Sequence, residues 1–251
     1  MARRLASRPR LDVDTGAVDV RLAILQLADS ALPVGTFAHS FGLESALADG
    51  SVRDEVDVAA WLQEYIAGQL VTNDLLVIRA VYTQLEEALG VAGPALPEGV
   101  ALLDRVITAS TLAAEAREAS RTMGARLLEV AVECFPSPAV DAYAEAVRTG
   151  VCLGHFPIAF ALSLAGLGAD RSEVMRTYAT SVVVGLTQNA VRAVPLGQAA
   201  GQRIITHLHP SITRAVSRAQ TLPEDLLGAT SPQLEIAQMR HEHLHARMFS
   251  S

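Results

Sequence analysis

The sequence predicts an all-α protein, a compact single-domain bundle of about ten helices. Half of its 251 residues are hydrophobic, which is enough to bury one large core. Apolar residues recur at steps of three and four along most of the chain, the spacing of one buried helix face. The alternation of period two that indicates β-strands is hard to find, and no repeat of solenoid length is evident.

The first residues carry mixed charge with little periodicity, so we predict a mobile arm over residues 1–19 and an all-helical domain over residues 20–251. Strong helical patterns cover residues 58–66 and 75–89. A loop rich in glycine and proline is predicted over residues 90–99. Further helices are predicted over residues 101–119, 121–134, 139–149, 157–167, 172–190 and 196–208.

The charged residues narrow the classes of function. All 20 basic residues are arginines, so a site built on lysine, as in a P-loop, a Schiff base or a kinase, is excluded. A net charge of -7 argues against nucleic acid as the main partner, because phosphate binding requires a basic surface.

The apolar residues indicate a globular, cytoplasmic protein without a membrane partner. The longest apolar stretch, residues 153–169, is interrupted by His155 and Pro157 and falls short of the roughly 20 apolar residues of a spanning helix. The N-terminus lacks the apolar core of a signal peptide. Cys134 and Cys152 suit neither a disulfide framework nor a zinc site, so we interpret them as inert core thiols.

A turn that runs into a helix over residues 31–44 is the first candidate site. It contains Pro33 and Gly35 and leads to a helix N-terminus, as an anion site would, but it lacks the glycine patterns of nucleotide-binding loops. His39 and Ser40 are adjacent, which places them about 100° apart on a helix rather than in line for nucleophile activation. We therefore interpret His39 as a capping or interface residue in preference to a catalytic one.

Gly124 marks a second segment, on a helix face shared by Met123 and Leu127. Glycine at this position costs roughly 1 kcal/mol in helix propensity. Because glycine has no side chain, the backbone of another element is able to pack close to it. We interpret this segment as a helix-packing site.

The third segment covers residues 190–203. Pro195 is predicted to open a helix in which Gly197 and Gly201 stack one turn apart. Gln198 and Gln202 would also stack one turn apart, along the adjacent face of the same helix. The pattern is typical of a tight helix–helix contact whose amides are satisfied by hydrogen bonds, and it indicates no metal or acid–base chemistry.

The fourth segment is the C-terminal tail. A last helix is predicted to begin at Ser231 and Pro232, a good N-cap and a good first helical residue. On that helix His241 and His245 would lie one turn apart on the same face, a weak pair of metal ligands, while His243 points elsewhere. The residue types alone do not distinguish a labile metal-binding contact from a solvent-exposed helix face.

The four segments together are more specific than any one of them. In the same order, over nearly the whole chain from Leu25 to Ser251, they resemble the UreF family of urease accessory proteins. The motifs that carry the resemblance are Leu32-Pro33-Val34-Gly35 with Ser40-Phe41-Gly42-Leu43-Glu44, Ser120-Arg121-Thr122-Met123-Gly124, His155-Phe156-Pro157-Ile158-Ala159-Phe160, Val194-Pro195-Leu196-Gly197-Gln198 with Gly201-Gln202, and Met239-Arg240-His241-Glu242 with Arg247-Met248-Phe249.

The resemblance implies a non-catalytic helical protein, dimeric in its assemblies, that binds the accessory protein UreD (UreH in some systems) and the GTPase UreG. The complex delivers nickel to apo-urease, and the chain itself binds no cofactor tightly. By resemblance, Phe37 and Arg247 recruit the GTPase, and residues 239–249 order against UreD as the principal docking element. The partner-binding residues that it implies are Phe37, His39, Arg240, His241, Glu242, Arg247 and Phe249.

The sequence departs from the family pattern in two places. Residues 35–41 differ from the usual run of glycine, serine and aromatic residues, which leaves His39 outside the shared motif. In the tail, His243 and His245 fall where the family usually carries a hydroxyl residue and a tyrosine, so only His241 belongs to the pattern.

Two other functions compete with this one. The first is a nickel-binding chaperone or metal-dependent helical enzyme in which His207 or His209 joins His241 and His245 as the third ligand. The second is a helical adaptor for another GTPase.

Overall fold

The computed structural model describes residues 18–89, 96–229 and 231–251. Within these ranges the chain is helical and contains no β-strand, so the predicted all-α class is confirmed. Residues 1–17 of the predicted arm and residues 90–95 of the predicted loop lie outside the described residues. The α-helices are α1 (Val20–Ala28), α2 (Leu43–Ala48), α3 (Glu55–Tyr65), α4 (Leu76–Ala88), α5 (Glu98–Ser110), α6 (Ala114–Cys134), α7 (Pro138–Arg148), α8 (Phe156–Ala165), α9 (Arg171–Ala193), α10 (Gln198–Thr221) and α11 (Pro232–His241).

Helix α8 lies at the centre of the bundle. Every side chain from Phe156 to Leu164 is buried, because this segment carries no charged residue and packs against α4, α6, α7 and α9. Pro157 occupies the first turn, where a missing backbone N–H costs no helical hydrogen bond. The apolar stretch at residues 153–169 thus contains a core helix, α8. None of the helices in the described part of the chain is both long and apolar enough to cross a membrane.

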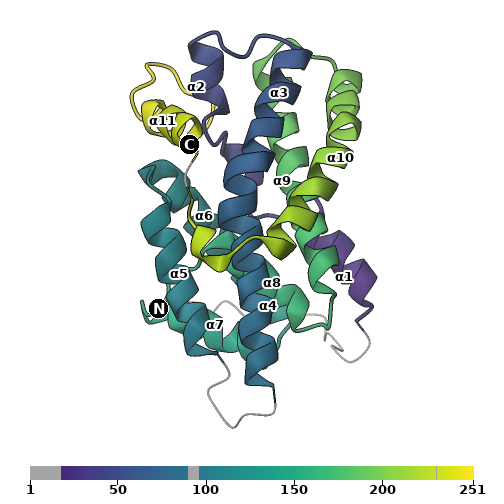
Figure 1. Cartoon of the computed structure of the whole chain (residues 1–251), viewed down its shortest axis with the longest axis vertical. Coiled ribbons are helices and arrows are strands. Elements are labelled where there is room, and N and C mark those ends of the chain that lie inside the picture. The colour runs from purple at the N-terminus through teal and green to yellow at the C-terminus, as the bar shows by residue number, and fades with distance from the viewer. Residues whose placement is uncertain (1–17, 90–95, 230) are drawn as a thin grey trace, which may run out of the picture.

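One continuous helical column crosses the molecule from α3 through α4 (Figure 1). Its middle part, η3 (Ile66–Leu75), is a π-helix, whose wider turns are rare and are frequently found at functional sites. Asn73 and Asp74 lie on this π-helix. Helix α10 packs along both α3 and η3, and α9 packs along α10.

Several helices begin where a short polar side chain caps the first turn. The carboxylates of Asp19, Asp54 and Asp170 and the hydroxyl of Ser137 accept hydrogen bonds from backbone N–H groups of α1, α3, α9 and α7, respectively. Such caps satisfy donors that have no partner within the helix and contribute about 1 kcal/mol each.

The break between α5 and α6 corrects the sequence prediction. We expected one helix to end at Ala119, but α6 runs through Ser120 and the break lies at residues 111–113. Thr111 is the C-cap of α5, because its ψ of 93° leaves the helical range, and its N–H and hydroxyl make the last bonds of the helix, to the carbonyl of Ile107. The Arg117 guanidinium, six residues further on, donates to the Thr111 carbonyl at 2.6 Å and satisfies an acceptor that has no helical partner.

Helix α10 also differs from the prediction. Pro195 does not open it, because the helix begins at Gln198, and it continues to Thr221 instead of ending at Leu208. Pro210 lies inside the helix. The helix continues past this proline since its apolar face stays buried on both sides of it, and burial outweighs the lost backbone hydrogen bond.

Candidate functional site

The C-terminal tail packs against the first candidate segment of its own chain. Helix α11 lies beside α2, and the chain end returns to η2 (Thr36–Ala38) (Figure 1). Two backbone hydrogen bonds join the segments: Ser250 N–H donates to the Ala38 carbonyl at 2.7 Å and Ser40 N–H donates to the Ser251 carbonyl at 2.5 Å. We call the contact between residues 35–44 and residues 239–251 the tail–turn interface.

His241 is the buried centre of this interface. Its side chain is 0% exposed, with Nδ1 2.6 Å from Oε2 of Glu115 and Nε2 2.8 Å from Oε2 of Glu44. Both nitrogens are therefore engaged by the protein itself.

Glu44 and Glu115 extend the contact to the last residues of the chain. The Glu44 carboxylate accepts hydrogen bonds from the N–H groups of Met248 at 2.6 Å and Phe249 at 3.1 Å. The Glu115 carboxylate accepts one from Arg247 at 2.7 Å. Two carboxylates from α2 and α6 thus hold the tail at three successive residues. Sequence reasoning missed Glu115, since it lies 126 residues from His241 and carries no local signal.

Helix α9 supports the other side of the interface. The Phe249 ring is buried, with the Arg192 guanidinium carbon 5.4 Å from its centroid. Arg192 also donates to the Phe37 carbonyl at 3.2 Å, and Asn189 donates to the His39 carbonyl at 2.8 Å. Neither Arg192 nor Asn189 was singled out in the sequence, because each acts on a backbone atom about 150 positions away.

His39 lies at the inner edge of the interface. Its Nδ1 lies 2.9 Å from the Ser251 hydroxyl. Burial, and then the nearby Arg126 guanidinium, lower the pKa of His39 below its usual value. A neutral ring paired with a serine hydroxyl at the chain end suits a role in positioning the tail.

The residues predicted to bind partners fall into two groups. His39, His241 and Phe249 are buried within the tail–turn interface. The other members reach solvent; they are Phe37, which is half-buried, and Arg240, Glu242 and Arg247, which are exposed. The first group holds the segments together, and the second group forms the outer surface of the same contact.

The predicted pairing of His241 with His245 is wrong. Helix α11 ends at His241, with Glu242 as its C-cap, so His245 does not lie one helical turn further along the same face. His207 lies on α10 within 3.2 Å of the Gln63 amide. Across the described ranges, no three histidine, cysteine, aspartate or glutamate side chains are grouped to hold a metal ion.

Two of the glycines singled out in the sequence lie at close approaches. A Cβ on Gly124 would lie 2.0 Å from the carbonyl oxygen of Gly154, so α6 reaches the start of α8 only because this side chain is missing. A Cβ on Gly35, which has a φ of 87°, would lie 2.6 Å from the Arg126 guanidinium. Pro33, the other residue of that turn, is exposed.

The glycines of the third segment differ from each other. A Cβ on Gly201 would lie 2.9 Å from a methyl group of Val191, so this glycine allows α10 to approach α9. Gly197 is the N-cap of α10 and has no atom within 4 Å of its Cβ position, which corrects the predicted pair of stacked glycines. Gln198 and Gln202 are exposed and do not lie in the α9–α10 contact.

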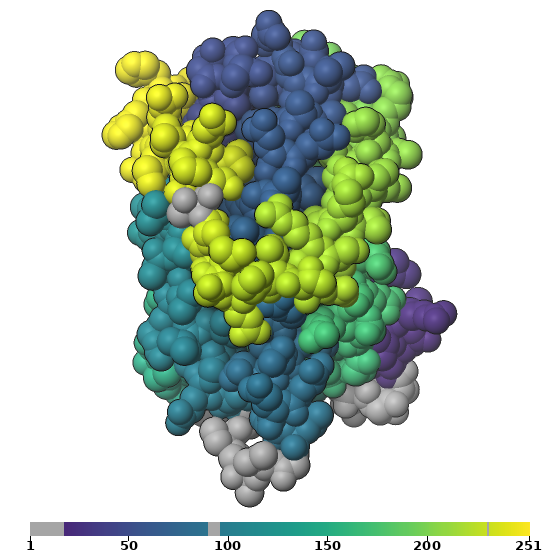
Figure 2. Space-filling view, viewed as in Figure 1, coloured from purple at the N-terminus to yellow at the C-terminus, as the bar shows by residue number. Residues whose placement is uncertain are grey.

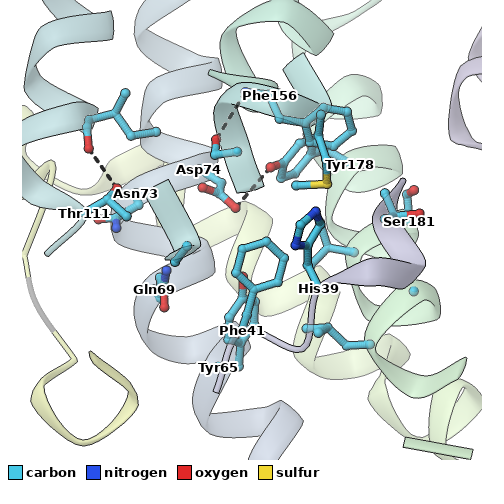
Figure 3. A pocket seen from close by; sticks show the side chains of 18 residues that line it. His39, Phe41, Tyr65, Gln69, Asn73, Asp74, Thr111, Phe156, Tyr178 and Ser181 are labelled. Atoms are coloured by element: carbon cyan, nitrogen blue, oxygen red, sulfur yellow. Dashed lines mark hydrogen bonds between the residues drawn. The ribbon is translucent and has the colours of Figure 1, made fainter. Parts of the chain in front are cut away.

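A small cavity of about 50 Å³ lies beneath the tail–turn interface, between η2, η3 and α9. Figure 3 shows His39, Phe41 and Asp74 around it. The Tyr178 hydroxyl donates to the Asp74 carboxyl at 3.1 Å, and burial raises the pKa of Asp74 to about 7. The Asn73 side-chain oxygen is buried and has no hydrogen-bond partner in the described part of the chain. Such polar groups suit a few bound water molecules.

Comparison with known proteins shows the family of this chain. The family model described as UreF matches residues 52–209. The urease accessory protein UreF of Paenarthrobacter aurescens strain TC1 is 46% identical over 92% of this chain and 98% of its own length. The proteins of that name from Arthrobacter sp. strain FB24 and Lachnoclostridium phytofermentans are 45% and 40% identical over 92% of this chain and 97% and 98% of their own lengths. The chain therefore belongs to the UreF family of urease accessory proteins.

Proposed function

We propose that this chain is a non-catalytic scaffold of urease maturation. It binds UreD, or UreH in systems that use that name, and recruits the GTPase UreG, so that the assembled complex inserts nickel into apo-urease. The chain acts in the cytoplasm as a homodimer within the complex, without a tightly bound cofactor of its own and without nucleic acid or membrane as a partner. Nickel is the cargo of the complex.

The tail–turn interface is the observation that carries this proposal. It joins residues 35–44 to residues 239–251. Its outer part presents the aromatic ring of Phe37 and the guanidinium groups of Arg240 and Arg247. Aromatic and arginine side chains supply much of the affinity of protein interfaces, because they combine large contact area with forked hydrogen bonds. A surface of this composition suits protein recognition.

The buried members give this surface its rigidity. His241 joins Glu44 to Glu115, and Phe249 lies against Arg192, so the tail is held before any partner arrives. A preorganised surface loses less conformational entropy on binding, which raises affinity. In this proposal UreD binds along residues 239–249, and Phe37 and Arg247 contact UreG.

Reconstitution from purified components tests the proposal. The chain is mixed with UreD, with UreG and with both, each with GTP, GDP or no nucleotide, and the mixtures are separated by size-exclusion chromatography with light scattering. We expect a stable complex with UreD and addition of UreG to that complex. If the three proteins elute separately under every nucleotide condition, the scaffold function is wrong, and an adaptor role for another GTPase takes its place.

A further inference from the structure

A groove outside the tail–turn interface runs between α10 and the column formed by α3 and η3. It consists of two hollows of about 450 and 370 Å³ that share the side chain of Gln63. Figure 2 shows α3 and α10 side by side on the viewed face. From Arg203 to Arg218 the groove follows α10 for roughly 22 Å, at 1.5 Å of rise per residue. We call it the α3–α10 groove.

Small apolar side chains line much of this groove. Ala59 and Ala60 of α3 line one hollow. Ala67 of η3 and Ala215 of α10 line the other. Val56, at the rim, is 75% exposed, which is a large exposure for a valine. Alanine walls let a partner helix come close, because no long side chain separates the two backbones.

The two ends of the groove differ in charge. At one end Arg203 is neutralised by Glu55, whose carboxylate it contacts through two hydrogen bonds of 2.9 and 2.6 Å. At the other end Arg214 and Arg218 lie one helical turn apart, and neither forms an ion pair with a carboxylate of the described residues.

Each of these two guanidinium groups retains free donors. Arg214 donates to the Ser211 hydroxyl at 3.0 Å and Arg218 donates to the Ala67 carbonyl at 3.0 Å, out of five N–H donors in each group. The 24 residues of α10 include no aspartate or glutamate, although the chain as a whole has a net charge of -7. The groove is therefore a local basic surface on an acidic protein.

We propose that the α3–α10 groove binds an amphipathic helix of a partner protein in the urease-maturation complex, with two carboxylates one turn apart on Arg214 and Arg218. Carboxylates are stabilised in the first turn of a helix by its dipole, so the partner helix lies antiparallel to α10 with its N-terminus at Arg218. The existence of the complex rests on the proposed function, whereas the groove and its charge do not.

A helix fits this surface better than a small anion does. A phosphate or nucleotide would use the arginine pair but would leave the apolar hollow beside Val56 and Ala59 empty. An amphipathic helix of about 15 residues covers the whole length of roughly 22 Å and pairs apolar with apolar and acidic with basic surface.

The first test uses a synthetic peptide and so does not depend on any partner. The probe is a labelled helical peptide of about 15 residues with an alanine–leucine face. Two glutamates, one helical turn apart, lie at its N-terminal end. We expect it to bind the full chain in fluorescence anisotropy, and Arg214→Glu/Arg218→Glu to weaken binding by about tenfold or more. The matched control is Arg105→Glu/Arg176→Glu, which makes the same charge change on α5 and α9.

Three results of this experiment would overturn the proposal. The first is no binding to the unaltered chain. The second is equal loss in the control variant, which would indicate nonspecific attraction. The third is equal binding of the peptide with glutamine in place of glutamate. Stronger binding of inorganic phosphate or of a single-stranded oligonucleotide than of the peptide would assign the groove to a polyanion instead.

The second test locates the occupant in the assembled complex. A benzoylphenylalanine introduced at Ser217, an exposed residue between the two arginines, is irradiated in mixtures with UreD, UreG and apo-urease. We expect an adduct on an acidic helical segment of one of these proteins. An adduct only with a second copy of this chain, or none in a complex that has formed, contradicts the proposal. If no complex forms with the unaltered chain, the proposed function fails, and the peptide experiment alone decides the groove.

Discussion

Nε2 of His241 lies 2.8 Å from Oε2 of Glu44, although 197 residues separate the two in sequence. The opposite nitrogen of the same ring lies 2.6 Å from Glu115 on α6. A side chain near the C-terminus therefore joins the N-terminal turn to the middle of the chain, and the surface around it is built from all three segments.

Removal of the His241 ring will loosen the tail. His241→Ala leaves the largely buried carboxylates of Glu44 and Glu115 without their shared hydrogen-bond partner, and leaving a buried polar group unsatisfied costs about 1–3 kcal/mol. Urea denaturation measures the loss in the free energy of unfolding, and hydrogen exchange of residues 239–251 shows where it occurs. His243→Ala, an exposed position nearby, is the control. Equal stability of the two variants would contradict the buried role of His241.

Arg247→Ala will weaken recruitment of UreG to the complex with UreD. Arg247 is 43% exposed and contacts Glu115, so its outer face is available to a partner. Loss of a forked cation at a protein interface costs roughly 2 kcal/mol, or about thirtyfold in affinity. Biolayer interferometry with immobilised complex measures this affinity. Arg148→Ala, an exposed arginine paired with Glu145 on α7, is the control, and unchanged UreG binding by the Arg247 variant would remove this residue from the site.

Nickel titration of the isolated chain separates a scaffold from a nickel chaperone. The nitrogens of His241 already face carboxylates, and His245 lies beyond the end of α11. We therefore expect calorimetry to detect no nickel site of micromolar affinity that His241→Ala abolishes. A site of that affinity, lost in the variant, would restore the chaperone as the function of the tail.

Gly124→Ala will disrupt the contact between α6 and the start of α8. The added Cβ would lie 2.0 Å from the Gly154 carbonyl oxygen, and relief of such overpacking costs about 1–3 kcal/mol. Thermal unfolding followed by circular dichroism measures the change. Gly197→Ala, where no atom lies within 4 Å of the new Cβ, is expected to cost only about 0.5–1 kcal/mol, the difference between glycine and alanine at an N-cap. Equal melting temperatures for the two variants would rule out a tight approach at Gly124.

The raised pKa of Asp74 predicts that the stability of the folded chain depends on pH. Its pKa is raised to about 7 in the folded protein from a usual value of 3.8, so the folded state holds the proton more tightly than the unfolded state. Stability attributable to this group is then present below pH 3.8 and falls as the pH rises to about 7. Asp74→Asn removes this contribution, so the free energy of unfolding of the unaltered chain should fall relative to the variant between about pH 4 and pH 7. Parallel pH profiles for the two proteins would contradict the raised pKa.

Most of the fold could be predicted from local pattern. The apolar spacing of three and four along α4 and the proline in the first turn of α8 are local properties, and they identified helices that the structure contains. Two boundaries could not be predicted in this way. Thr111 at the end of α5 is capped by Arg117 from the next helix, and α10 passes Pro210 because its buried face continues on both sides.

The sequence predicted the two segments of the candidate site but not the contact between them. The turn near Pro33 and Gly35 and the tail near His241 were both identified from their residues, as separate features. That they lie against each other could not be predicted, because backbone hydrogen bonds such as that from Ser250 to Ala38 carry no sequence signal. The pairing of His241 with His245 failed for the same reason, since α11 ends where His241 enters a buried contact with distant carboxylates.

Local patterns were sufficient to predict the all-helical class, the UreF family and the segments of the candidate site, because helix periodicity and motifs are properties of neighbouring residues. Contacts between distant residues were needed to show that Glu115 and Arg192 support the tail and that Phe249 is buried. They were also needed to show that Arg214 and Arg218 remain without carboxylate partners in the described part of the chain. Each of these facts depends on side chains brought together from distant positions, where packing and charge select partners that sequence spacing does not specify.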